Sequence, residues 1–228
     1  TTLNSSTGLI EGNVTGISNN TTIQFDVAAT DAEIQSNTRT FTLTVLMVAL
    51  GAFIGDSISQ NISLVVTERG KLYSFGGGGY NGDGRGNRYI PTINNNGSLT
   101  GKTISQISCS PRHTTVLATD GSVHAWGYNL LNEGSLGDGS GKTQRRPVAV
   151  NGGSLSGKTV SFVACGGYPE GKSRGYAIAT DGSVHAWGYN QGIGFLGDGT
   201  TTHRMLPVEI TNNGSLNGKT LTKIVCGH

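Results

Sequence analysis

A twelve-residue segment, ATDGSVHAWGYN, occurs at residues 118–129 and returns unchanged 61 residues later, at residues 179–190. A weaker copy, VTERGKLYSFGG, begins at Val66. Internal repetition constrains a fold strongly, because each copy is one unit that must bury its apolar face against its neighbours. The repeat therefore predicts a chain built largely from stacked units of roughly sixty residues.

Further landmarks follow each copy in the same order. The first is a glycine turn, NGDG or LGDG, and the next is a proline; the prolines are Pro91, Pro147 and Pro207. A segment of the form GSLxGKT comes next, and a short β-branched run then ends at a cysteine; the cysteines are Cys109, Cys165 and Cys226. The shared order shows that the whole unit is repeated and not only its central segment.

The middle GSLxGKT segment looks like a nucleotide-binding motif. GGSLSGKT, which begins at Gly152, fits the phosphate-loop pattern G-x-x-x-x-G-K-[ST]. The other two copies break the pattern, because Asn96 and Asn213 stand where the middle copy has Gly152. A phosphate loop must also lead into a helix, whereas the following VSFVACGG alternates and β-branches like a strand. GKT is predicted to be a turn that enters a strand, and nucleotide hydrolysis is disfavoured.

Each unit is predicted to hold four short strands. In the second unit these are residues 116–119 and 122–128, joined by a tight Asp120-Gly121 turn, then residues 147–150 and 159–165. The proline places the third strand at an edge, because proline cannot donate to a central ladder. Four short antiparallel strands per repeat are typical of a β-propeller blade. The predicted fold is all-β: a partial β-propeller of four-stranded antiparallel blades, with an N-terminal β-sandwich-like segment.

The motif DGSVHAWGYN…LGDG…P…GKTVSFVACGG resembles the regulator-of-chromosome-condensation repeat, whose blades assemble into a seven-bladed propeller. The resemblance covers residues 46–228. Trp126 and Trp187, with Phe75 in the same column, are expected to fill the space between neighbouring blades. About three blades cannot close a ring, since propellers need about four to eight. The chain is therefore expected to belong to a longer protein or a multi-subunit assembly.

Residues 1–45 do not fit the repeat. The alternating apolar residues of TIQFDV and FTLTV suit two sandwich strands. The segment resembles the C-terminal part of an immunoglobulin-like, cadherin-related module of bacterial surface and phage tail proteins. Two domains follow from this reading, residues 1–45 and residues 46–228.

The composition and the titratable residues give no indication of nucleic-acid binding, a membrane span, catalysis or metal binding. A net charge of +2 with scattered basic residues argues against nucleic-acid binding. The longest apolar run, residues 43–54, is too short to span a membrane. The cysteines share one repeated column and are expected to be buried thiols, and His124 and His185 share another and are expected to pack. No catalytic residue, cofactor site or metal site is predicted, and the protein is not expected to be an enzyme.

The favoured function is a structural or adhesive binding module of a larger surface or virion protein, located outside the cell. Its partner would be a protein or a surface glycan. The alternative is a regulatory propeller that binds and modulates a partner enzyme, as an exchange factor or an inhibitor does. The loop around residues 167–175 and its counterpart one blade earlier are the candidate contacts. Their candidate residues are Tyr168, Lys172, Arg174, Arg112 and His113.

Overall fold

The computed structural model divides the chain into two compact units, Thr1–Ala49 and Leu50–His228. It describes residues 2–4, 9–11, 21–30, 36–45, 62–77, 79–129, 133–168, 172–210 and 219–226, with side chains from residue 62 onward. The two units are described separately below.

Two pairs of antiparallel strands make up the part of the first unit that the structure describes. Strand β1 (Thr2–Asn4) pairs with β2 (Leu9–Glu11), and β3 (Thr21–Thr30) pairs with β4 (Ser36–Val45). Phe25 lies opposite Phe41 in the longer ladder, so the two alternating apolar segments found in the sequence are partners. The immunoglobulin-like assignment itself stays a prediction.

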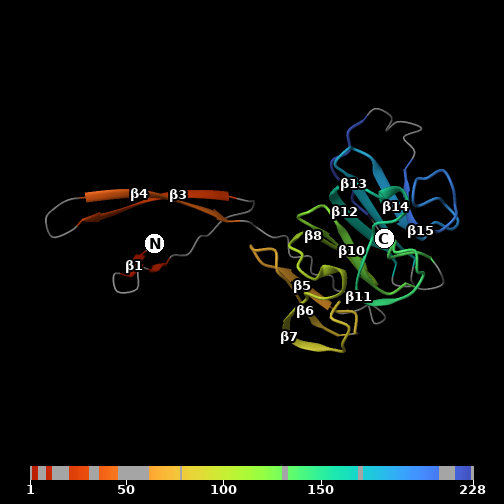
Figure 1. Cartoon of the computed structure of the whole chain (residues 1–228), viewed down its shortest axis with the longest axis horizontal. Helices are drawn as coiled ribbons and strands as arrows, with labels where there is room; N and C mark the ends of the chain where they lie inside the picture. Colours follow the sequence, from red (N-terminus) through yellow and green to blue (C-terminus); the bar gives the residue numbers. More distant parts are fainter. Residues whose placement is uncertain are drawn as a thin grey trace. The chain divides into compact units, whose positions relative to one another are not determined.

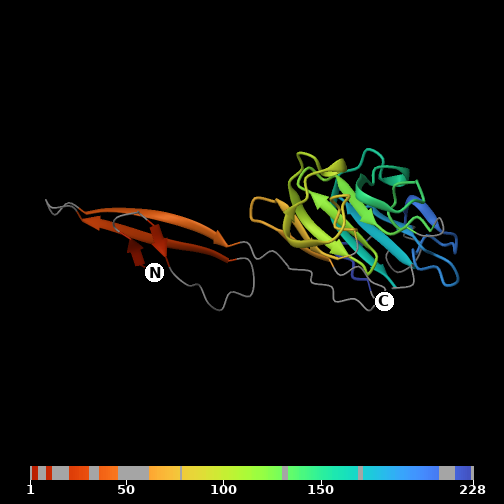
Figure 2. The same ribbon diagram turned by 90° about the horizontal axis from the view of Figure 1, so that it is seen from below.

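The described residues of the second unit form three antiparallel sheets in which the strands follow one another in chain order (Figures 1 and 2). The first sheet holds β5 (Ile62–Val66), β6 (Leu72–Gly76) and β7 (Arg88–Ile93). The second holds β8 (Ile104–Cys109), β9 (His113–Ala118), β10 (Val123–Gly127) and β11 (Gln144–Ala149). The third holds β12 (Val160–Gly167), β13 (Ser173–Ala179), β14 (Val184–Gly188) and β15 (Arg204–Glu209).

These sheets confirm the predicted four-stranded antiparallel blades, but the grouping of the strands was wrong. The strand expected at residues 159–165 to close the second unit is β12, which pairs with β13 and so opens the third sheet. The helices in the described part of the chain are two 3-10 turns of three residues each, η1 (Gly97–Leu99) and η2 (Gly153–Leu155). Gly121 turns the β9–β10 hairpin with a φ of +80°, a conformation that strains any residue with a Cβ. The first sheet is described with three strands, and residues 46–61, which precede it in the chain, lie outside the described residues.

The tryptophans lie between the blades, as predicted. Trp126 on β10 is fully buried and packs with Leu64 and Leu72 of the preceding sheet. Trp187 on β14 is fully buried against Leu117 and Leu136 of the second blade. Each indole therefore joins one blade to the blade before it, and such large aromatic side chains supply much of the apolar burial at a junction.

Side-chain hydrogen bonds add to each junction. Gln106 on β8 bonds through its amide to both the N–H and the carbonyl oxygen of Val163 on β12, at 3.1 and 2.9 Å. The hydroxyl of Ser108 accepts from the backbone N–H of Cys165 at 2.8 Å. The three cysteines are unpaired thiols; Cys165 is buried as expected, whereas Cys109 and Cys226 are only half-buried. These bonds fix the register of neighbouring sheets and hence the position of the loops at their ends.

The first two GSLxGKT segments each form a 3-10 turn that leads into a strand, as predicted, whereas residues 214–218 of the third lie outside the described residues. Ser98 and Ser154 in these turns bond to the Nδ1 atoms of His124 and His185, at 2.8 and 2.6 Å. The two histidines are buried. The histidines pack as predicted, and they also have a second role. Each imidazole bonds the preceding 3-10 turn to the blade that contains the histidine.

Candidate functional site: a cationic and aromatic loop edge

One edge of the three sheets gathers the candidate residues. Antiparallel strands that follow one another bring the ends of β8, β10, β12 and β14 to the same edge as the starts of β9, β11, β13 and β15. We call this edge the loop edge. Its described loops lie within residues 77–87, 110–112, 128–143, 168–172 and 189–203.

Four cationic side chains at the loop edge lie over aromatic rings. The guanidinium carbon of Arg112 lies 4.6 Å from the ring centre of Tyr128, and that of Arg145 lies 5.8 Å from that of Tyr80. In the third blade, Lys172 Nζ lies 5.9 Å from the ring centre of Tyr189, and the guanidinium of Arg174 lies 4.7 Å from that of Phe195. All four distances fall within the range of cation–π attraction.

The rings also contact one another. Tyr80 and Tyr128, from neighbouring blades, meet edge to face with centres 6.2 Å apart. Tyr189 lies 5.9 Å from Phe195 and 4.8 Å from the imidazole of His203, again between ring centres. A shallow hollow beside the first pair of rings is lined by Tyr80, Arg112 and Trp126, among others. The rings thus form two contacting groups, one around Tyr80 and Tyr128 and one around Tyr189, and the cations lie over the rings of these groups.

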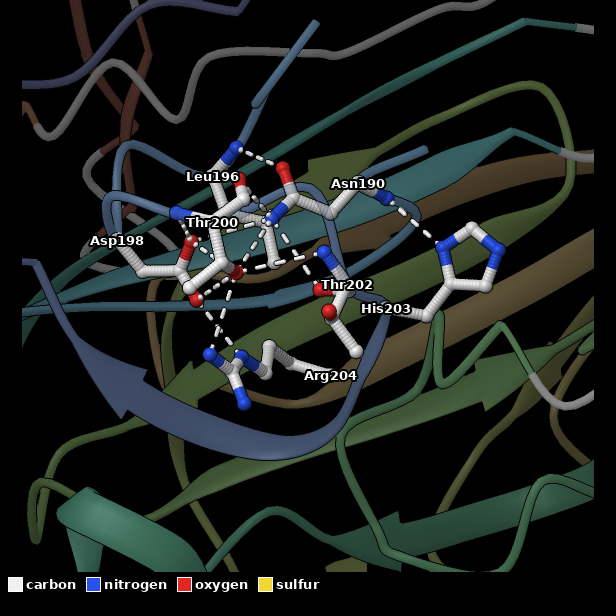
Figure 3. A network of polar contacts seen from close by, with 7 residues as sticks. All are labelled: Asn190, Leu196, Asp198, Thr200, Thr202, His203 and Arg204. Atoms are coloured by element: carbon white, nitrogen blue, oxygen red, sulfur yellow. Dashed lines mark hydrogen bonds and ion pairs between the residues drawn. The ribbon is translucent and has the colours of Figure 1, made fainter. Parts of the chain in front are cut away.

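A hydrogen-bond network holds the third-blade loop in place (Figure 3). The buried Asn190 amide nitrogen donates to Asp198 Oδ1 at 3.1 Å and to the carbonyl oxygen of Thr202 at 3.2 Å. Its Oδ1 accepts from the N–H of Leu196 at 2.9 Å, and its backbone N–H donates to His203 Nδ1 at 3.0 Å. The asparagine therefore fixes both the glycine turn and the histidine that lies against Tyr189.

The structure places three predicted contact residues in the loops and two elsewhere. Lys172 is exposed, and Arg112 and Tyr168 are half-buried at the loop edge. His113 and Arg174, predicted to be loop residues, instead belong to β9 and β13 and are only 3% and 6% exposed. They occupy equivalent places, since each pairs with the glycine that follows a tryptophan.

The strand begins early because the preceding turn is tight. The Ser110 hydroxyl accepts from the backbone N–H of His113 at 3.1 Å and bonds to its Nδ1 at 2.6 Å. Burial lowers the pKa of His113 to about 4, so the ring is neutral at pH 7. Arg112 and Lys172 are thus better placed than His113 to meet a partner. Whether the five predicted residues bind one stays a prediction.

Glu133 is a feature that sequence reasoning missed. Its side chain is buried at 7% exposure, and burial raises its pKa to about 7, against the opposing charges of Arg112 and Lys172. The loop sequence LLNEGS gives no sign of this burial. The rings were also missed, although the repeated tyrosine after each Trp-Gly pair, Tyr128 and Tyr189, was a visible signal.

The described residues lack two kinds of feature. They contain no group of three or more histidine, cysteine or carboxylate side chains placed to hold a metal ion. Nor is any helix in this described part long and apolar enough to cross a bilayer.

The blades define the class of this protein, and comparison with known proteins supports it. Residues 104–134 and 181–228 match models of the regulator of chromosome condensation (RCC1) repeat. Human WBSCR16 has a similar fold, with a TM-score of 0.56 and 25% identity over 76% of this chain and 40% of that one. Saccharomyces cerevisiae Prp20p, described with its binding to Gsp1p and histones, has a TM-score of 0.52 and 21% identity. The match covers 68% of this chain and 37% of Prp20p. The second unit therefore contains RCC1 repeats, and its described sheets have the fold of propeller blades.

Curated proteins with related sequences are longer. The human E3 ubiquitin-protein ligase HERC2 is 32% identical over 166 residues, which are 72% of this chain but 3% of that protein. The ultraviolet-B receptor UVR8 of Arabidopsis thaliana is 29% identical over 160 residues, which are 69% of this chain and 33% of the receptor. The chain thus spans a third or less of these two relatives.

Proposed function

We propose that the RCC1-type blades form a non-catalytic module that binds an acidic segment of a partner protein at the loop edge and so modulates that partner. The observation that carries the proposal is the pair of exposed cations, Arg145 and Lys172, that lie over Tyr80 and Tyr189 at one edge of the blades. A ring beneath a guanidinium or ammonium group orients the cation while leaving its N–H donors available to a carboxylate.

Ion pairs occur at both edges, and those of the loop edge are Arg88–Asp83 and Arg204–Asp198, but the loop edge holds further cations beside them, Arg145 and Lys172. At the opposite edge, Lys102 and Lys158 are each paired with an aspartate, Asp120 and Asp181, at 2.5 Å. At the loop edge, the carboxyl group beside Arg112 and Lys172 belongs to Glu133, whose raised pKa weakens its charge near neutral pH. The loop edge therefore keeps a positive field that would draw an acidic segment toward it.

The comparisons favour the regulatory alternative over the adhesive reading. Prp20p binds proteins, and UVR8 and HERC2 are named as a receptor and a ligase. A propeller that presents loops on rigid sheets suits such recognition. A surface or virion location stays a prediction, as does a glycan ligand.

Fluorescence anisotropy with a labelled peptide rich in glutamate and aspartate tests the proposal. Arg145→Ala with Lys172→Ala removes two exposed cations, and affinity should fall by about 5- to 30-fold if each contributes roughly 0.5–1 kcal/mol. Lys71→Ala is the matched control, because Lys71 is an exposed lysine at the opposite edge. The Lys71→Ala variant should bind the acidic peptide with the affinity of the parent.

A second variant tests the electrostatic part. Glu133→Gln removes the residual negative charge beneath the cations and should strengthen binding of the acidic peptide, most clearly above pH 7. Absence of binding to the acidic peptide, or an equal loss in the Lys71→Ala control, would contradict the proposal. Binding to a glycan array that Arg145→Ala with Lys172→Ala leaves unchanged would instead favour the adhesive reading.

A further inference from the structure

A hollow of about 420 Å³ lies at the junction between the first and second blades, and its size is typical of a small-ligand site. The glycine turn and β7 of the first blade form one wall, and Arg146 on β11 of the second blade forms the other. The two walls are joined, because the N–H of Gly84 donates to the carbonyl oxygen of Arg145 at 3.0 Å. The exposed Tyr89 and Ile90 of β7 do not line the hollow. It therefore belongs to a junction between two described blades.

The charged side chains of the hollow are three arginines and one aspartate, Arg85, Arg88, Arg146 and Asp83. Arg88 is paired, since its Nε lies 2.5 Å from Asp83 Oδ2. The guanidinium groups of Arg85 and Arg146 have no hydrogen-bond or ion-pair partner among the residues that the structure describes. The Arg146 side chain packs against Gly84, the residue before Arg85, so both side chains lie beside the same turn. The hollow thus holds an excess of two positive charges.

The repeat shows that a blade junction does not require these two arginines. Where the first blade has Arg85, two residues after the aspartate of the turn, the other blades have Ser140 and Thr200. Each of these hydroxyl groups donates to the aspartate of its own turn, at 2.7 and 2.9 Å. On β15, Leu206 occupies the place of Arg146, since both residues precede the proline of their strand. The first junction therefore carries two guanidinium groups where the second has a serine and a leucine.

We propose that this hollow, which we call the arginine hollow, binds a phosphoryl group through the guanidinium groups of Arg85 and Arg146. A phosphate monoester carries a charge of about −1.5 to −2 at pH 7, which matches the excess of positive charge. Guanidinium groups also donate paired N–H bonds to phosphate oxygens. Arg145 and Lys172 do not line the hollow, so the proposal does not rest on the acidic-segment site.

Substitutions copied from the other blades test the proposal. Arg85→Ser and Arg146→Leu each introduce a residue that the repeat itself uses at that position, so both variants should fold. Calorimetric titration with a short glycine–serine peptide that carries one phosphoserine should show binding to the parent. Each variant should bind at least about tenfold more weakly, because each loses a charge-assisted hydrogen bond. Arg69→Ser, the matched control at an exposed arginine of the β5–β6 turn, should bind like the parent.

Further ligands identify what the arginine hollow recognises. The same peptide with aspartate in place of phosphoserine should bind at least about tenfold more weakly, because a carboxylate has less charge and fewer acceptor oxygens. Sodium phosphate distinguishes the source of the group. Tighter binding of the phosphopeptide indicates a phosphorylated partner protein, and equal binding of phosphate indicates a free phosphate compound.

Three outcomes would overturn the proposal. The first is a parent that binds neither the phosphopeptide nor phosphate. The second is binding that Arg85→Ser and Arg146→Leu leave unchanged, with circular dichroism spectra that match the parent. The third is an aspartate peptide that binds as tightly as the phosphopeptide, since the hollow would then select charge and not a phosphoryl group.

Discussion

The ammonium group of Lys158 lies 2.5 Å from a carboxylate oxygen of Asp181, and Lys102 makes the same contact with Asp120 one repeat earlier. Lys158 is the lysine of the segment that fits the phosphate-loop pattern. Strand β12 follows the segment, so no helix N-terminus faces the place that a phosphate would occupy. The lysine joins a 3-10 turn to the hairpin of its own blade.

We predict that Lys158→Ala leaves nucleotide binding unchanged because the parent has none to lose. Isothermal titration with ATP and Mg²⁺ should show no heat of binding in either protein. The melting temperature should fall only slightly, because the ion pair is exposed and screened by solvent. Saturable ATP binding that the substitution abolishes would contradict this reading.

The two glycines of the same segment should differ sharply in their tolerance of alanine. Both have positive φ, +58° at Gly153 and +72° at Gly157. A Cβ on Gly153 would overlap the carbonyl oxygen of Pro207, whereas a Cβ on Gly157 would meet no described atom within 4 Å. Gly157→Ala should therefore cost about 1–2 kcal/mol of unfolding free energy from backbone strain alone. Gly153→Ala should cost clearly more, because β15 must shift.

Urea denaturation of the two variants measures the difference. Gly157→Ala serves as the matched control, since both substitutions add the same methyl group to the same turn. Equal losses of stability would show that blade contact through Gly153 contributes nothing beyond backbone strain.

The two buried tryptophans should respond differently to phenylalanine. Trp126 Nε1 donates to the carbonyl oxygen of Tyr80 at 3.0 Å, whereas Trp187 Nε1 has no hydrogen-bond partner among the described residues. Both substitutions leave a small cavity, and Trp126→Phe also removes the hydrogen bond to a partly buried carbonyl, which adds about 1 kcal/mol. Thermal unfolding should rank Trp126→Phe below Trp187→Phe, and the reverse order would count against this assignment.

The repeat made most of the fold predictable. The glycine turns and prolines recur in the same order in each unit, and the two tryptophans occupy the same place in identical segments. The sequence alone therefore predicts the blades and the inter-blade positions of Trp126 and Trp187. Strand ends were less accurate. His113 belongs to a strand because a serine side chain three residues earlier closes the turn, and sequence periodicity carries no sign of that bond.

The candidate site was only partly predictable, because its parts come from different blades. Arg112 and Lys172 were found as loop cations, but the rings beneath them depend on how the Trp-Gly-Tyr segments turn at the strand ends. Arg145 over Tyr80 joins two blades, and no local pattern relates these residues. The burial of Glu133 likewise results from packing between loops that are distant from one another in sequence.

The buried histidines predict how stability depends on pH. Burial lowers the pKa of His113 to about 4, below its ordinary value of 6.5, and lowers that of His124 to about 4 as well, with Lys102 adding to the effect. Between these values the unfolded chain binds protons that the folded chain does not. Stability is therefore complete above about pH 6.5 and falls as the pH drops toward 4.

His113→Gln should flatten this dependence. The glutamine does not titrate, so the variant should escape the part of the acid destabilisation that His113 causes, up to about 3 kcal/mol for the full displacement of its pKa. Urea unfolding at pH 7.5 and pH 4.5 gives the comparison, and Thr119→Ala, which changes no titratable group, should keep the slope of the parent. An unchanged slope in His113→Gln would mean that the imidazole takes up its proton in the folded blade, and hence that the β9 start opens to water at low pH.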